Sequence, residues 1–249
     1  MQTNEKKEFK LIALDMDGTL LNNQQEISKE NREAIAKAQE QGVHVVLSTG
    51  RSLLTCREYA QSLQLSSYLI TVNGSEIWDE SGELVERKLI DASSIEKMWN
   101  LTQEHKLNFW AVTTDKVWRD EFPEDIASQE WLKFGYDIPD DALREEVLKQ
   151  IAGISDFEIS NSSLTNLEIN ALGINKAKGI MTVCERLGIS MDEVIAMGDS
   201  LNDMAMIEAA GCGIAMGNAQ EAVKEAADWV TDTNVNNGVA KAISHWVLK

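Results

Sequence analysis

The chain has 249 residues, of which 43% are hydrophobic and 26% are charged, and its formal net charge at pH 7 is −18. This composition is that of an ordinary globular protein, and the length allows one large domain or two smaller ones. The excess of acidic side chains argues against binding to nucleic acid, because that affinity depends largely on Lys and Arg side chains that neutralise phosphates.

The N-terminal part of the chain alternates predicted strands with predicted helices. Phe9–Leu14, Val43–Ser48 and Tyr68–Thr71 are short apolar runs, which are typical of strands buried in a parallel sheet. Ser28–Gln41 has the spacing of an amphipathic helix, and Ser28 is a suitable N-cap. A second helix is expected between Gly50 and the third strand.

The C-terminal part shows the same alternation. Its predicted strands are Val194–Met197, Gly213–Ala215 and Trp229–Val230, and its predicted helices are Lys176–Leu187, Asn202–Ala209, Ala219–Ala226 and Gly238–Val247. Alternation at both ends of the chain predicts a single α/β domain, in which helices cover both faces of a doubly wound, Rossmann-like parallel sheet.

The middle of the chain differs in composition, because both prolines and four of the seven tryptophans lie between residues 84 and 165. Its pattern predicts, in order, a strand, the helix Ser94–Lys106, a strand pair over Asn108–Arg119, two helices, and strands near Phe157–Ser160 and Leu167–Asn170. We predict that residues 84–165 form an α+β domain inserted into a core made of residues 1–83 and 166–249.

No apolar segment reaches the roughly 18 residues needed to cross a bilayer. The segment Met1–Lys10 is polar and lacks the apolar stretch of a secretory signal. We therefore expect a cytoplasmic protein with no membrane partner. Its three cysteines are far apart and form no metal-binding pattern, so we expect them in the core: Cys56, Cys184 and Cys212.

Two aspartates, Asp15 and Asp17, directly follow the first predicted strand. Alternate residues of an extended segment point the same way, so the two carboxylates are expected to converge. Two like charges about 4 Å apart repel by roughly 4 kcal/mol at an effective dielectric constant near 20. A cation or a bound proton must offset that repulsion. An ordinary turn after a strand is the alternative for this segment taken alone.

A third carboxylate, Asp199, follows the predicted strand Val194–Met197. Mg²⁺ is usually held by one or two carboxylates together with water and phosphate oxygens, so Asp199 would complete a magnesium site with the first strand end. Asp203, four residues later, is placed to orient Asp199 or a bound water. The alternative is a helix N-terminus, which also favours acidic residues.

A protein this acidic repels a phosphorylated ligand at long range, so a phosphate site needs local positive charge or N–H donors. Ser48-Thr49-Gly50-Arg51 ends the second strand, where hydroxyl and backbone N–H groups can bind phosphate oxygens. Lys176 opens the helix that precedes the Asp199 strand, and Lys178 is the alternative lysine.

Together these four segments resemble the haloacid dehalogenase-like hydrolases, specifically the Cof-type phosphatases that carry a cap between their second and third motifs. Asp15-Met16-Asp17-Gly18-Thr19-Leu20 matches the first motif, Ser48 the second, Lys176 the third, and Gly198-Asp199 with Asn202-Asp203 the fourth. The resemblance extends over nearly the whole chain. The K-x-x-G pattern of the family favours Lys176, because Gly179 follows it by three residues.

The resemblance implies that Asp15 attacks phosphorus and forms an aspartyl-phosphate, while Asp17 serves as general acid and then general base. It implies a Mg²⁺ ion held by the Asp15 carboxylate, the Asp17 backbone carbonyl and Asp199. The groups expected to hold the phosphoryl oxygens are Ser48, Lys176, Asn202 and the backbones of Met16 and Thr49.

The implied function is hydrolysis of a small phosphorylated metabolite, because a cap over the site excludes large phosphoproteins. Substrates in this family include sugar phosphates, FMN, pyridoxal phosphate and 5-amino-6-(5-phospho-D-ribitylamino)uracil. The alternatives are phosphoryl transfer to an acceptor other than water, as in mutases, and a non-catalytic protein that binds a phosphometabolite. The segment Lys116-Val117-Trp118-Arg119 is a candidate lid that reads the substrate.

Overall fold

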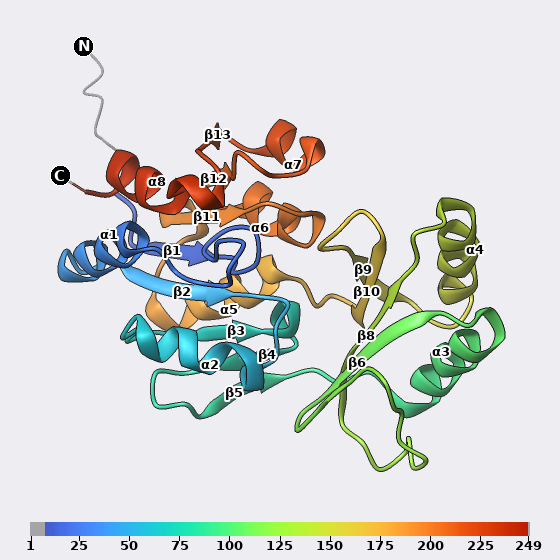
Figure 1. The fold of residues 1–249 in the computed structure, drawn as a ribbon. Coiled ribbons are helices and arrows are strands. Elements are labelled where there is room, and N and C mark those ends of the chain that lie inside the picture. Colours follow the sequence, from blue (N-terminus) through green and yellow to red (C-terminus); the bar gives the residue numbers. More distant parts are fainter. Residues whose placement is uncertain (1–7, 249) are drawn as a thin grey trace.

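The computed structural model describes residues 8–248 and contains two sheets (Figure 1). The larger has eight strands in the order β13-β12-β11-β1-β2-β3-β4-β5. Its strands are β1 (Leu11–Leu14), β2 (His44–Ser48), β3 (Leu69–Thr71), β4 (Glu76–Trp78), β5 (Leu84–Arg87), β11 (Val194–Gly198), β12 (Cys212–Ala215) and β13 (Trp229–Val230). The six strands from β13 to β3 are parallel, and β4 and β5 add an antiparallel edge.

Helices cover both faces of this sheet. The helices on one face are α1 (Lys29–Glu40), α2 (Leu53–Ser62), α7 (Glu221–Ala226) and α8 (Gly238–Trp246), and those on the other are α5 (Lys176–Leu187) and α6 (Met204–Ala209). The side chains of successive β1 residues point to opposite faces of the sheet. Ile12 packs on the side of α1, and Ala13 packs on the side of α5. The predicted doubly wound α/β core is therefore confirmed, and the three cysteines are buried as expected.

The second sheet is antiparallel, with five strands in the order β7-β6-β8-β10-β9. They are β6 (Asn108–Thr113), β7 (Val117–Trp118), β8 (Trp131–Asp137), β9 (Phe157–Ser160) and β10 (Asn166–Ala171). Helices α3 (Ala92–His105) and α4 (Asp141–Ala152) pack on the face away from the core, as Figure 1 shows. This sheet and its two helices are called the cap below.

One predicted element of the cap is wrong. Two helices were expected between Arg119 and Phe157, but the structure has α4 and, in place of the other helix, strand β8. Trp131, Phe134 and Tyr136 of β8 are fully buried, while β6 and β10 pair with its two edges. A short apolar run does not distinguish a buried strand from a buried helix, so the pairing on both edges decides the outcome.

The predicted limits of the inserted domain do not coincide with the points where the chain changes sheets. Strand β5 pairs with β4 in the larger sheet, although it follows residue 83. Strand β10 lies between β8 and β9 in the cap, although it follows residue 165. We therefore propose that the inserted domain runs from Lys88 to Leu172.

The order of the larger sheet places a crevice beside the cap. From β1 the chain adds β2 and β3 on one side, whereas from β11 it adds β12 and β13 on the other. The direction of winding therefore reverses between β1 and β11, and open α/β sheets bind ligands outside the carboxyl ends of the strands at such a point. These ends point toward the cap in Figure 1. Within residues 8–248, no helix has both the length and the apolar character needed to cross a bilayer.

Candidate active site

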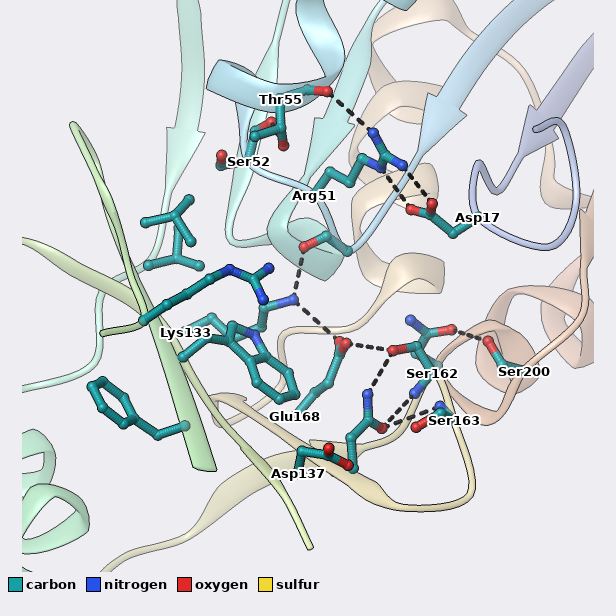
Figure 2. Close-up of a pocket in the computed structure, with 18 of the residues that line it drawn as sticks. Asp17, Arg51, Ser52, Thr55, Lys133, Asp137, Ser162, Ser163, Glu168 and Ser200 are labelled. Atoms are coloured by element: carbon teal, nitrogen blue, oxygen red, sulfur yellow. Dashed lines mark hydrogen bonds and ion pairs between the residues drawn. The ribbon is translucent and has the colours of Figure 1, made fainter. Parts of the chain in front are cut away.

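A cavity of about 770 Å³ lies between the carboxyl ends of the core strands and the cap sheet (Figure 2). The core contributes loops that follow β1, β2 and β11. The residues that line it from the core are Asp15, Asp17, Gly50, Arg51, Ser52, Thr55, Ser200 and Asn202. The cap contributes residues from β6, β7, β8 and β10 and from the segment between β9 and β10. The strand ends on which the sequence placed the chemistry thus open into one cavity.

A buried lysine connects two of the motif carboxylates. The Nζ atom of Lys176 donates to Oδ1 of Asp15 at 2.5 Å and to Oδ1 of Asp203 at 2.6 Å. Burial by itself would lower the pKa of Lys176, but the two carboxylates outweigh it and hold the pKa above its ordinary value. The lysine is therefore charged, and it supplies the local positive charge that the acidic chain requires.

Three carboxylates form a candidate metal site. Asp15, Asp199 and Asp203 each present one oxygen, and these oxygens lie within 4.8 Å of one another. Burial raises the pKa of Asp15 well above its ordinary value, and Asp203 and Asp199 add to that effect against the attraction of Lys176. Burial and the charge of Asp203 raise the pKa of Asp199 to about 7. The cluster thus needs a cation or a proton, as the sequence indicated for the first strand end.

Hydrogen bonds fix the geometry of this cluster. The hydroxyl of Thr19 donates to Oδ1 of Asp199 at 2.9 Å. Oδ2 of Asp203 accepts from the backbone N–H groups of Asp199 and Ser200 at 2.9 and 3.0 Å. Asp203 therefore positions Asp199 through the backbone. Gly18 has a φ of +81°, and a Cβ there would overlap the Asp199 carboxylate, so this close approach requires glycine.

Asp15 and Asp17 were expected to converge, and both line the cavity. The chain turns after Asp15 instead of staying extended, and the Asp17 side chain lies outside the carboxylate cluster. Arg51 binds both of its oxygens, with Nε to Oδ2 at 2.6 Å and Nη2 to Oδ1 at 2.5 Å, as Figure 2 shows. The Arg51 guanidinium carbon also lies 5.3 Å from the ring centroid of Tyr59. The sequence placed Arg51 in the second motif without predicting this role.

The expected role of the Thr49 backbone is wrong. Its N–H donates to the carbonyl of Ile70 at 2.9 Å, which continues the pairing of β2 with β3, so it cannot bind phosphate. Ser48 is fully buried, and its hydroxyl has no hydrogen-bond partner within residues 8–248. Neither residue lines the cavity, whereas Gly50 does. Gly50 belongs to the segment that the sequence indicated for phosphate binding, but it was not among the groups expected to hold the phosphoryl oxygens, and its N–H is now a further candidate.

Met16 and Asn202, like Ser48, stay candidates for binding the phosphoryl oxygens. The N–H of Met16 has no hydrogen-bond partner among the described residues, although its carbonyl accepts from Thr19 and Leu21. Asn202 lines the cavity, and its backbone N–H donates to the carbonyl of Asn161 at 2.9 Å. Because Asn161 lies between the cap strands β9 and β10, this hydrogen bond joins the cap to the fourth motif.

A buried ion pair of the cap is hydrogen-bonded to the core. Lys133 of β8 donates to the Gly50 carbonyl at 2.7 Å and lies 3.2 Å from Glu168 of β10, and Asn73 donates to the same Glu168 oxygen at 2.6 Å. Figure 2 shows Lys133 and Glu168 pointing toward each other. The sequence did not indicate these residues, because charged side chains on antiparallel strands usually face solvent.

The candidate lid contributes to the cavity in part. Val117 and Arg119 line it. Lys116 pairs with Glu121 at 2.5 Å and lies 4.0 Å from the centroid of the Trp118 ring. Trp118 is not among the lining residues, and the cap tryptophan that lines the cavity is Trp110.

The Lys133–Glu168 pair predicts a pH-dependent contribution to stability. Burial would raise the pKa of Glu168, but Lys133 and hydrogen bonds from Asn73 and Ser162 outweigh it and hold the pKa below its ordinary value. A carboxylate with a lowered pKa stabilises the fold above its unfolded pKa of about 4.3 and loses that contribution as the pH falls through the folded value.

We therefore expect Glu168→Gln to lower the free energy of unfolding at pH 7 by about 1.5–3 kcal/mol, the usual contribution of a charged hydrogen bond. The difference between variant and wild type should shrink as the pH falls below about 4.3. Urea unfolding of both proteins at several pH values measures this difference. A difference that stays constant with pH would show that the ionised carboxylate of Glu168 is not responsible.

A family model described as haloacid dehalogenase-like hydrolase matches residues 12–146 and 123–243. The chain is a haloacid dehalogenase-like hydrolase. Its sequence is 62% identical over 244 residues, 98% of each chain, to 5-amino-6-(5-phospho-D-ribitylamino)uracil phosphatase YcsE of Bacillus subtilis. It is 30% identical to pyridoxal phosphate phosphatase YbhA of Escherichia coli, over 96% of this chain and 99% of that one.

The fold of this hydrolase also matches solved structures of the family. A haloacid dehalogenase-like hydrolase from B. subtilis superposes with a TM-score of 0.88 at 27% identity, covering 96% of this chain and 100% of that one. The resemblance, the capped α/β fold and the phosphatase activity expected from the motifs are thereby confirmed.

Proposed function

We propose that this hydrolase is a magnesium-dependent phosphatase that removes phosphate from 5-amino-6-(5-phospho-D-ribitylamino)uracil in the cytoplasm. The observation that carries the proposed substrate is the 62% identity to YcsE, which extends over 98% of both chains. The observation that supports the reaction is the buried cluster around Asp15, which opens into the cavity beside the cap.

In this proposal Asp15 is the nucleophile. One of its carboxylate oxygens bonds to phosphorus while the bond to the leaving ribityl oxygen breaks, which gives an aspartyl-phosphate. Lys176 holds the Asp15 carboxylate in place and offsets the negative charge of the phosphoryl group. Catalysis of phosphoryl transfer rests mainly on such positioning and charge stabilisation.

Asp17 is the proposed acid and base. It donates a proton to the leaving oxygen and later accepts one from the water that attacks the aspartyl-phosphate. Its carboxylate lines the cavity but is paired with Arg51, so it has to turn away from Arg51 to reach the leaving oxygen. The proposed contacts of the phosphoryl oxygens are the N–H groups of Met16 and Gly50 and the side chains of Ser48, Asn202 and Lys176.

The residues present fit a magnesium ion. Mg²⁺ prefers hard oxygen ligands, and the clustered oxygens of Asp15 and Asp199 are of that kind. Asp203 is engaged by Lys176 and two backbone N–H groups, so we assign it to support rather than ligation. The ligands would be Asp15, Asp199 and the Asp17 carbonyl. When bound, the ion supplies positive charge beside the transferring phosphoryl group.

A panel of phosphate esters tests the proposed substrate. We expect kcat/KM to be highest for 5-amino-6-(5-phospho-D-ribitylamino)uracil, at least about 10-fold (1.4 kcal/mol) above FMN, pyridoxal phosphate and glucose 6-phosphate. EDTA should abolish the release of inorganic phosphate, and added Mg²⁺ should restore it. A different ester at the top of the panel would contradict the proposed substrate, and full activity in EDTA would contradict the metal.

A further inference from the structure

The cap face that lines the cavity is built from alternate residues of three neighbouring strands. One row across β6, β8 and β10 consists of Asn108, Asp137 and Asn166, and the next consists of Trp110, Gly135 and Glu168. All of these residues except Gly135 line the cavity. Residues two apart on a strand share a face, so the two rows lie side by side on the floor of the cap.

Trp110 covers Gly135. The two residues are directly paired across β6 and β8, and a Cβ atom at position 135 would overlap the indole atoms Cε2 and Cζ2. Glycine in a strand interior weakens the strand and often marks a close approach. Here it lets the indole lie against the sheet. Since Trp110 also lines the cavity, the indole that lies against Gly135 borders the space open to a ligand.

The indole of Trp110 has no aromatic or cationic partner among residues 8–248. Three other tryptophans of the cap differ in this respect. Trp99 stacks on Phe122 with ring centroids 4.2 Å apart, Trp131 lies 5.2 Å from the same ring, and Lys116 lies over Trp118. A half-buried indole that borders a cavity and lacks a ring partner is suited to stack with a flat ligand group.

We propose that Trp110, lying flat on Gly135, is the platform on which the heterocyclic ring of the substrate stacks. The proposal rests on the proposed function and deepens it, because it assigns the residue that distinguishes a ring-bearing phosphate ester from a simple sugar-alcohol phosphate. Asn108 and Asp137, in the adjacent row, offer an amide and a carboxylate to the polar edge of such a ring.

The position of the platform fits a substrate with a ring at one end and phosphate at the other. Lys133 of β8 donates to the carbonyl of Gly50, whose N–H is a proposed phosphate contact, so this part of β8 lies at the reacting end of the cavity. Gly135 is two residues further along β8, roughly 7 Å away at the usual rise per residue. A phosphorylated chain attached to the ring would run from the Trp110 row toward Asp15.

The test compares two substrates that differ in the ring, 5-amino-6-(5-phospho-D-ribitylamino)uracil and ribitol 5-phosphate. We expect Trp110→Leu to lower kcat/KM for the ring-bearing ester on the order of 10- to 100-fold, as stacking of one base on an aromatic side chain does. The loss should appear mainly in KM, and ribitol 5-phosphate should be hydrolysed as before. Trp110→Phe should keep most of the preference, and Gly135→Ala should reduce it by tilting the indole.

Trp118→Leu is the matched control, because Trp118 belongs to the same sheet but does not line the cavity. It should leave the ratio of the two kcat/KM values unchanged. Equal losses on both esters in Trp110→Leu, or no loss on either, would overturn the platform. If the wild type does not prefer the uracil compound, the proposed substrate fails separately. The platform is then tested with the other ring-bearing esters. A larger loss of kcat/KM in Trp110→Leu for FMN and pyridoxal phosphate than for ribitol 5-phosphate would support it, and equal losses would overturn it.

Discussion

Replacing Asp15 with Asn is expected to lower phosphatase activity by at least about 10⁴-fold, the order of loss seen when an enzyme's nucleophile is removed. An amide oxygen is a poor nucleophile toward phosphorus, and the change also removes a charged oxygen from the proposed metal site. Release of inorganic phosphate from the best substrate, measured with Mg²⁺ present, gives the loss directly.

The fold should survive this change. Burial and two nearby carboxylates disfavour the charge on Asp15, and Asn has nearly the same shape without that charge. We therefore expect the melting temperature of Asp15→Asn to match or exceed that of the wild type, as is common when a functional residue is replaced. A fully active Asp15→Asn enzyme would contradict the proposed nucleophile, and an unfolded variant would contradict the account of its stability.

Replacing Lys176 with Met is expected to remove activity and also to destabilise the protein. Lys176 is fully buried and bonds Asp15 and Asp203, so its loss leaves two buried carboxylates close together without a positive charge between them. Removing one partner of a buried ion pair typically costs about 3–5 kcal/mol. Urea unfolding and phosphate release, measured on the same preparation, should both show the loss.

Lys178→Met is the matched control for this prediction. Lys178 is two residues further along α5 and exposed, and the sequence alone left it as the alternative lysine. We expect its replacement to leave both activity and the free energy of unfolding close to the wild-type values. The reverse outcome, an inactive Lys178→Met beside an active Lys176→Met, would show that Lys178 and not Lys176 has the proposed role.

Much of the core could be predicted from the sequence because its signals are local. Buried parallel strands appear as apolar runs, and helix ends carry caps such as Ser28, whose side chain accepts from the N–H of Asn31 at 3.2 Å. Strand β8 could not be predicted, because its assignment depends on pairing with β6 and β10, which are far apart in the sequence. Such pairing overrides local preference.

The active site, like the fold, could be predicted only in part. Lys176, Asp199 and Asp203 could be placed from the motifs, because strand ends and helix starts at a switch point meet in space. The orientation of Asp17 could not, since it depends on the turn at Gly18 and on Arg51 from another strand. The contribution of Lys133 and Trp110 depends on how the cap sits over the core, and nothing local in the sequence records that arrangement.

A single-turnover experiment with substrate labelled at phosphorus tests the central claim most directly. Mg²⁺-loaded enzyme in excess is mixed with labelled 5-amino-6-(5-phospho-D-ribitylamino)uracil and quenched with acid after increasing times. We predict a transient protein-bound phosphate that maps to the peptide containing Asp15, that disappears as inorganic phosphate forms, and that is absent from Asp15→Asn. Release of inorganic phosphate without any protein-bound label at any time, or a label on another residue, would contradict the account.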